Sequence, residues 1–171
     1  MDRTANLLGT VALAVAERIN QAAREIVSHS GETPAALVVI GYGLSPSNDE
    51  LRRVLGLSHP GTVRLVDRLV ADGLVERGKG RDKRAVALHL TDKGFAARKA
   101  LLAGRLSVIR PLLLPLESSE RKDLAGLLSK LLTSMQPNDL ERCRLCRLCD
   151  DSICTDCPIP ADFRKTRETG E

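Results

Sequence analysis

Hydrophobic positions recur at three- and four-residue spacing through most of this chain, which predicts a mainly helical fold. Residues 5–29 form the first such segment, with apolar side chains on one face and charged ones on the other. Residues 35–41 are apolar nearly all round, which predicts a short buried helix. We expect Thr33 to cap this helix and Pro34 to occupy its first position.

Residues 47–58 carry the end signals of two helices joined by a tight turn. Ser47 and Glu50 form a capping box for a helix over about residues 49–55. Gly56 suits the left-handed residue that ends such a helix, and Ser58 caps the next one, with Pro60 in its first turn. This order predicts a helix-turn-helix.

The second of these helices separates into two faces. Its predicted inward stripe consists of Val63, Val66, Leu69 and Val70. The residues predicted to lie wholly or partly outside that stripe are Thr62, Arg64, Leu65 and Arg68. The first turn would enter a DNA major groove first, where exposed polar groups reach base edges and phosphates.

A β-hairpin is predicted to follow. Residues 74–77 and 85–90 alternate well enough to form two strands, and a glycine-rich turn over residues 78–84 joins them. This turn has four basic residues against one acidic residue, so it is too charged to be buried. An isolated hairpin is marginally stable, and we expect this one to lean on the helices with its tip free to reach DNA.

Two more helices complete the pattern. Thr91 caps a long one from Asp92 to about Val108, which Pro111 ends or bends, and residues 119–135 form the last. The apolar stripe of the last helix is Leu124, Leu127, Leu128, Leu131 and Leu132. These leucines and the first helix predict a dimer interface built from both ends of the chain; the alternative is that they close the monomer's own core.

Composition narrows the class of partner. Aromatic residues make up only 2% of the chain, so the core must be aliphatic, and single-strand or RNA binding, which stacks bases on aromatic rings, is disfavoured. Residues 50–93 contain ten Lys or Arg and six Asp or Glu, so this segment has a net charge of +4. The net charge of the whole chain is also +4. The positive charge therefore concentrates on the helix-turn-helix and the hairpin.

The first residues show no cleavage pattern of a signal peptide, and no apolar run approaches the roughly 18 residues of a membrane span. We therefore expect a cytoplasmic protein with no membrane partner. In a reducing compartment, five clustered cysteines indicate metal or redox chemistry more strongly than they indicate structural disulfides.

The stretch from Leu57 to Gly94 resembles the core of MarR-family transcriptional regulators. The matching parts are Leu57-Ser58 with Pro60, and then residues 64–69, 72–75, 82–84 and 90–94. In helix order and length the resemblance extends over roughly residues 5–135. It implies a winged helix-turn-helix with N- and C-terminal dimerisation helices, and a homodimer on a pseudo-palindromic operator of double-stranded DNA.

The resemblance also implies roles for single residues. Arg84 would be the wing-tip arginine in a minor groove, and Asp82 would hold the wing in shape by pairing with a neighbouring Arg. Two departures affect base reading, because the family often has Gln where this chain has His59 and Ser where it has Val63. The candidate DNA-binding residues are Ser58, His59, Pro60, Gly61, Thr62, Arg64, Arg68, Lys79, Arg81, Asp82, Lys83 and Arg84.

Each of these residues also has a plainer interpretation. Arg64 and Arg68 could be helix charges that pair with Asp67 or Asp72, and the basic turn could be a solvated loop. His59 could be a bystander instead of a base contact.

The cysteines near the end of the chain form two pairs with metal-ligand spacing. Cys146-x2-Cys149 and Cys154-x2-Cys157 are joined by four residues, and four thiolates can close a tetrahedral zinc site. A similar tail in some MarR-like proteins matches residues 146–158 and supports these four ligands. Cys143 would then be a spare or an alternative ligand.

An iron–sulfur cluster is the main alternative to zinc. The spacing Cys143-x2-Cys146-x2-Cys149 with a later Cys-Pro resembles bacterial ferredoxins, although four residues instead of three precede the next cysteine, Cys154. Free or disulfide-forming thiols are the third option. Loss of a bound metal would loosen the adjacent dimerisation helix and change the spacing of the two recognition helices.

The sequence therefore predicts four regions. These are a dimerisation helix (1–35), a winged helix-turn-helix (36–94), C-terminal dimerisation helices (95–136) and a cysteine-rich metal-binding tail (137–171). The predicted function is that of a DNA-binding regulator, most simply a repressor, with a small-molecule or redox effector. The competing hypothesis is a redox protein whose tail is the active centre and whose winged domain is an interaction scaffold. No arrangement typical of an enzyme is present in the sequence.

Overall fold

Helix α5 (Asp92–Ile109) spans the molecule in the computed structural model, which describes residues 2–27, 31–80, 86–135, 137–150, 152–153 and 157–159. The other elements are α1 (Arg3–Ile26), α2 (Thr33–Ile40), α3 (Asn48–Leu55), α4 (His59–Ala71), β1 (Val75–Lys79), β2 (Val86–Leu90), the 3-10 turn η1 (Arg110–Leu113), α6 (Ser118–Ser134) and α7 (Asp139–Cys146). The strands form a two-stranded antiparallel sheet, so the predicted mainly helical fold with a small hairpin is confirmed.

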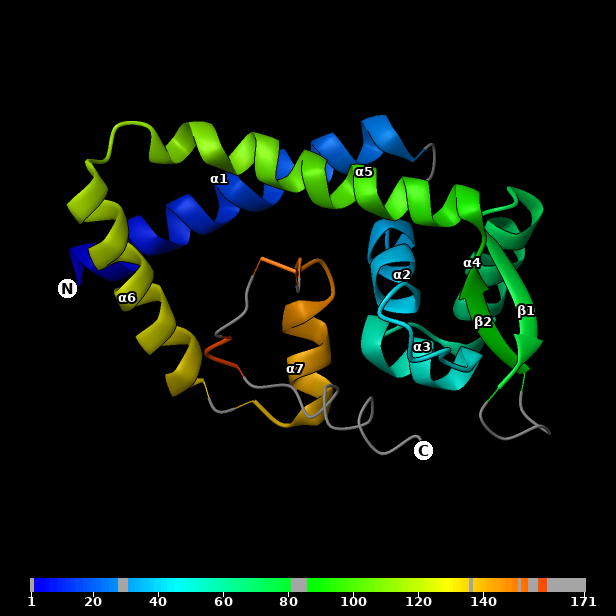
Figure 1. The fold of residues 1–171 in the computed structure, drawn as a ribbon. Coiled ribbons are helices and arrows are strands. Elements are labelled where there is room, and N and C mark those ends of the chain that lie inside the picture. The colour runs from blue at the N-terminus through cyan, green and yellow to red at the C-terminus, as the bar shows by residue number, and fades with distance from the viewer. Residues whose placement is uncertain are drawn as a thin grey trace.

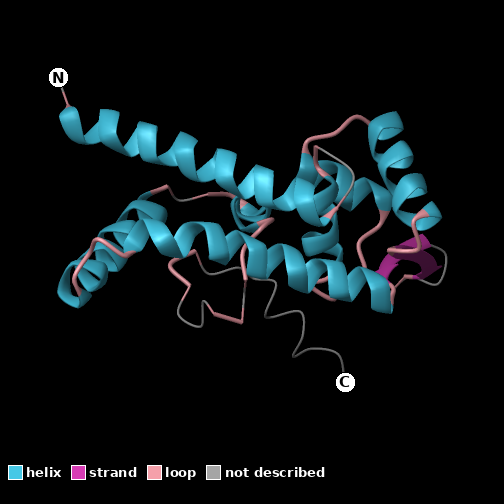
Figure 2. Cartoon of the chain, turned by 90° about the horizontal axis from the view of Figure 1, so that it is seen from above, coloured by secondary structure: helices cyan, strands magenta, loops and turns pink. Residues whose placement is uncertain are grey.

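The winged unit and the terminal helices occupy opposite ends of the molecule. Figure 1 shows α4, β1 and β2 beside the start of α5, and α6 with the beginning of α1 at the far end. Helix α1 packs along α5, and the two long helices extend together in Figure 2. Among the described residues, no helix is long and apolar enough to cross a membrane.

The core is aliphatic, as the shortage of aromatic residues predicted. It gathers around α2, which packs against α3, α5 and β2 and whose residues are all buried except half-buried Val39. The largest fully buried apolar side chains are Leu37, Leu51, Leu69, Leu88, Val38, Val66 and Val75. Each such side chain contributes about 1.5–3 kcal/mol through burial.

Three helix ends differ from the sequence prediction: both ends of α1 and the start of α2. Asp2 accepts a hydrogen bond from the Thr4 amide at 2.9 Å, so α1 begins at Arg3, and it ends at Ile26 because Val27 is extended. Thr33 is not a cap. It is the first residue of α2 and is buried, and its hydroxyl has no hydrogen-bond partner among the described residues.

Helix α7 was missed in the sequence. Asn138 accepts a hydrogen bond from the Glu141 amide at 3.0 Å, and the Glu141 carboxylate accepts one from the Asn138 amide at 2.9 Å. This capping box was a readable signal for a helix start. Helix α7 packs against α3, between the winged unit and α6 in Figure 1.

The start of α5 is joined to the residues that follow α4 by hydrogen bonds to three backbone carbonyls. Thr91 donates its hydroxyl to Gly73 O at 2.6 Å and its amide to Leu74 O at 3.1 Å, and Lys93 donates to Asp72 O at 2.7 Å. Thr91 also caps α5 by accepting a hydrogen bond from the Gly94 amide. These contacts join two of the motifs noted in the sequence, residues 72–75 and 90–94.

This joint predicts unequal effects for two glycines of α5. A Cβ at Gly94 would collide with the backbone oxygen of Leu74, whereas at Gly104 it would meet the flexible end of Ile26 at 2.8 Å. Because backbone cannot move aside cheaply, Gly94→Ala should lower the free energy of unfolding by about 1–3 kcal/mol. Gly104→Ala, which also gains helix propensity, should stay within about 1 kcal/mol of wild type. Urea unfolding followed by circular dichroism measures both, and equal losses would contradict the assigned contact.

Candidate nucleic-acid interface

The predicted helix-turn-helix is formed by α3 and α4. Ser47 donates its amide to the Glu50 carboxylate at 2.7 Å and accepts from the Glu50 amide at 3.3 Å, which confirms the capping box. Gly56 has the left-handed conformation expected at the turn, with φ 68° and ψ 26°. Local hydrogen bonds thus set the path from α3 to α4.

The first turn of α4 is open to solvent. Ser58 caps the helix by accepting a hydrogen bond from the Gly61 amide at 3.2 Å, as predicted. Ser58, His59 and Pro60 are exposed and Gly61 is half-buried. The positive end of the helix dipole at this turn favours an anion such as a DNA phosphate.

The inward face of α4 is rotated from the predicted one. Its buried residues are Thr62, Leu65, Val66 and Leu69, which share one helical face, while Val63 and Val70 are half-buried at its edges. Thr62 is 0% exposed and donates its hydroxyl to Ser58 O at 3.1 Å. The prediction that Thr62 and Leu65 lie outside the stripe was therefore wrong, and the Thr62 side chain is unavailable to DNA.

Arg64 and Arg68 lie on the opposite, solvent-exposed face of α4. Neither forms an ion pair with another described residue. Asp67, which stands between them in the sequence, instead pairs with Arg77 of β1 at 2.5 Å. Two cations thus remain available on the outer face of the candidate recognition helix.

The Asp67–Arg77 pair was not foreseen, because no local spacing relates a helix residue to a strand residue ten positions later. The pair connects α4 directly to the wing. Both side chains are partly exposed, so the pair contributes at most about 1 kcal/mol to stability. Its main consequence is the orientation of the wing relative to α4.

The wing pairs β1 with β2 in the register Val75↔Leu90 to Lys79↔Val86. The Leu88 amide donates to Pro46 O at 2.9 Å, which attaches the hairpin to the loop before α3. Lys79 is exposed at the end of β1. The predicted tip contacts Arg81, Asp82, Lys83 and Arg84 lie outside the described residues.

The cysteine tail (residues 137–171) begins with α7. Cys143 and Cys146 lie one turn apart on this helix, and the Cys149 amide donates to Cys146 O at 2.8 Å, which closes a turn over residues 146–149 that we call the first knuckle. Cys157 donates its thiol to Ile159 O at 3.1 Å. Cys154 lies outside the described residues.

The four described cysteines are half-buried thiols. Burial raises the pKa of the Cys149 thiol. The positive charge of Arg105 opposes this shift, and the charges of Cys157 and Asp150 add to it. Among the described residues, no three His, Cys, Asp or Glu side chains are grouped closely enough to hold a metal ion. The predicted ligand set of Cys146, Cys149, Cys154 and Cys157 includes a residue beyond that part of the chain.

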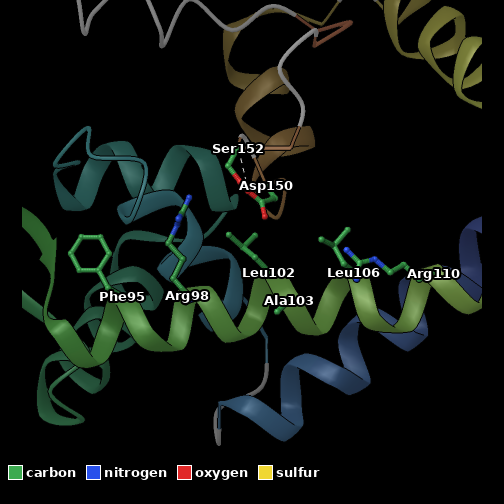
Figure 3. Close-up of a pocket in the computed structure, with 9 residues that line it drawn as sticks. Phe95, Arg98, Leu102, Ala103, Leu106, Arg110, Asp150 and Ser152 are labelled. Carbon is green, nitrogen blue, oxygen red and sulfur yellow. Dashed lines mark hydrogen bonds between the residues drawn. The ribbon is translucent and has the colours of Figure 1, made fainter.

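A groove of about 570 Å³ lies between α5 and the tail. Figure 3 shows Leu102 and Leu106 on the side of α5 that faces Asp150 and Ser152. Arg98, Lys99 and Arg110 also line it, so its wall on α5 is apolar with a cationic margin. The tail therefore lies over α5 as well as over α3.

Comparisons with known proteins find similarity to one family. Residues 34–85 match the model of the MarR family. The reduced form of MarR from E. coli is 29% identical, covers 73% of this chain and 96% of its own, and superposes with a TM-score of 0.58. No curated protein matches the sequence.

Two structures of MepR mutants from S. aureus share the fold at 18% identity. One covers 79% of this chain and 100% of its own with a TM-score of 0.68. The other, bound to an oligodeoxyribonucleotide, covers 80% of this chain and 100% of its own with a TM-score of 0.60. The helix-turn-helix, the wing and the residues that match the family model thus agree in their similarity to the MarR family, whose fold is a winged helix-turn-helix.

Proposed function

We propose that this protein is a transcription regulator that binds double-stranded DNA as a homodimer. The observation that carries the proposal is the outer face of α4, where Arg64 and Arg68 are exposed beside an open helix N-terminus. Helix α4 would enter the major groove, and the two arginines would bind phosphates or base edges. The cytoplasm, where such a regulator meets DNA, is its proposed location.

The wing would add contacts next to the groove. Lys79 is exposed at the end of β1, and the sequence supplies Arg81, Lys83 and Arg84 at the tip, with Asp82 among them. Arg84 is proposed to enter a minor groove, as the family resemblance implies. The Asp67–Arg77 pair would set the angle at which the wing approaches, because it links β1 to α4.

The homodimer is supported by apolar side chains that nothing in the described chain covers. No residue of α6 is buried, and Leu127, Leu128 and Leu131 are 57%, 44% and 44% exposed. In α1, Leu7, Leu8, Val11 and Leu13 are exposed as well. The alternative that the α6 leucines close the monomer's own core does not fit these exposures. A second copy would cover both helices and hold two α4 helices at a fixed spacing.

The tail is proposed to bind a metal through Cys146, Cys149, Cys154 and Cys157. The first knuckle supports this proposal, because its closed turn holds two cysteines of one pair three positions apart. Four thiolates suit zinc, and an iron–sulfur cluster is the alternative outcome. A metal site would stabilise a tail that has little apolar core of its own.

Removal of the exposed arginines should weaken DNA binding. Arg64→Ala and Arg84→Ala should each raise the Kd for DNA from upstream of the gene at least about tenfold. If the contact is to a phosphate, each should also reduce the salt dependence of log Kd by about one unit. Arg24→Ala, which removes an exposed charge from α1, is the matched control and should leave the Kd unchanged. Fluorescence anisotropy at several salt concentrations measures each Kd. If neither Arg64→Ala nor Arg84→Ala changes the affinity for DNA, the proposed interface is wrong.

Charge on α6 should separate the dimer. Leu128→Glu with Leu131→Glu places two carboxylates in the proposed apolar interface, so sedimentation equilibrium should give a monomer where the wild type gives a dimer. Lys130→Glu changes the charge of the same helix away from the leucine stripe and should leave the dimer intact. A monomeric wild type, or a dimer that tolerates both glutamates, contradicts this assignment.

Elemental analysis of protein purified without oxygen should find about one zinc per chain, in a colourless preparation. Cys146→Ser with Cys149→Ser should lose the metal, because two of four ligands are removed, while Cys143→Ser should retain it. A brown preparation that contains iron and acid-labile sulfide would instead identify the bound group as an iron–sulfur cluster. Protein without any metal would remove the proposed site.

A further inference from the structure

The cysteine tail docks on the DNA-binding unit through Tyr42, which lies in the turn between α2 and α3. The Tyr42 hydroxyl is 2.7 Å from Cys146 O and 2.8 Å from Cys149 O, so its single proton is shared between the two ends of the first knuckle. These carbonyls converge on one hydroxyl only while the knuckle keeps its closed turn. Arg98 of α5 stacks over the Tyr42 ring at 5.3 Å and fixes its position.

A second contact joins the tail to α3 itself. Arg144 of α7 donates to Arg53 O at 3.2 Å, and Arg53 lies in the last turn of α3, whose carbonyls have no partner within the helix. Arg144 also lies next to Gly56, the turn residue of the helix-turn-helix. The tail therefore contacts α3 at the point where the chain turns toward α4.

The rest of the first knuckle contacts the same unit. Arg147 lies 3.8 Å from the Glu32 carboxylate at the start of α2, and Leu148 packs against the buried core. The residues between the two cysteines thus anchor the knuckle on the helices that support α4. Any change in the shape of the knuckle must move at least one of these contacts.

We propose that Tyr42 is a positioning residue that transmits the state of the cysteine tail to the DNA-binding helix. With the first knuckle closed, Tyr42 holds the knuckle against the turn before α3, and Arg144 holds α7 against the last turn of α3. Together these two contacts form a clamp that keeps α3, and with it α4, in the arrangement described above. When the thiols are modified, the Cys146 and Cys149 carbonyls separate, the clamp on α3 is released, and DNA affinity falls. This inference rests on the proposed DNA-binding function.

The competing route runs through α6, where the sequence had placed the coupling. The Thr133 hydroxyl lies 2.9 Å from Ser129 O within α6 and 3.3 Å from Pro158 O of the tail, so its one proton is shared between the helix and the end of the tail. Thr133→Val removes this hydroxyl, and Tyr42→Phe removes the other, each with little change in shape. The two variants therefore separate a path through the DNA-binding unit from a path through the dimerisation helix.

The first test uses the protein's own fluorescence. The chain has one Tyr and no Trp, so emission excited at the tyrosine band reports Tyr42 alone. Methyl methanethiosulfonate caps cysteines: the thiolate attacks the sulfenyl sulfur, a mixed disulfide forms and methanesulfinate leaves. Capping full-length protein in the absence of DNA should change the Tyr42 emission, and dithiothreitol should restore it. No change in emission after complete capping, verified by mass spectrometry, would overturn the proposal.

The second test measures DNA affinity before and after capping. In wild type and Thr133→Val, capping should weaken binding about tenfold, a typical size for coupling between two sites. Uncapped Tyr42→Phe should already bind about as weakly as capped wild type, and capping should change its affinity less than about twofold. Arg144→Gln, which loses the second clamp contact, should likewise show a reduced response to capping.

The outcomes are distinguishable. A full response to capping in Tyr42→Phe and Arg144→Gln, or a response lost only in Thr133→Val, overturns the role of Tyr42. Thermal melts followed by circular dichroism confirm that each variant is folded. If Tyr42→Phe does not fold, Arg144→Gln still tests the proposal. If wild type binds no DNA from its own locus, the proposed function fails, and the fluorescence of Tyr42 still tests its contact with the knuckle.

Discussion

The burial of α2 is the constraint on which the rest of the structure depends. A helix that is apolar all round must be covered on every side, and here α5, α3 and β2 provide that cover. Each of these contacts positions a functional element. The contact with α3 sets the support helix of the helix-turn-helix, and that with β2 sets the base of the wing. The short apolar segment therefore determines where the DNA-binding elements lie.

An aliphatic core has a consequence for the charged residues. Leu, Val and Ala offer no polar group inside, so the arginines of α4 remain on the surface and the Asp67–Arg77 pair forms at its edge. Surface pairs contribute little to stability. Their effect here is directional: Asp67 is engaged with the wing, and Arg64 and Arg68 are left for an anionic partner. The positive charge of residues 50–93 is thus concentrated on one usable face.

Most features of the helix-turn-helix that are governed by local hydrogen bonds could be predicted from the sequence. The capping box of Ser47 and Glu50, the left-handed Gly56 and the cap at Ser58 each involve residues within a few positions of one another, so the order of residues alone specifies them. Features governed by packing could not. Which side of α4 faces inward depends on the neighbouring helix and strand, and this is why Thr62 was placed on the wrong face.

Long-range contacts of single polar groups were also beyond sequence reasoning. Tyr42 is separated from Cys146 by more than a hundred positions. No pattern of hydrophobic residues predicts that a hydroxyl will form hydrogen bonds with two distant carbonyls. Its discovery in the structure changes where the tail acts. A tail attached only to α6 would influence the spacing of two copies, whereas one held by Tyr42 and Arg144 acts within each copy, on the helix that supports α4. Because α2 and α5 hold Tyr42 from the other side, a change in the knuckle meets a rigid core and is transmitted to α3, the helix that the tail contacts directly.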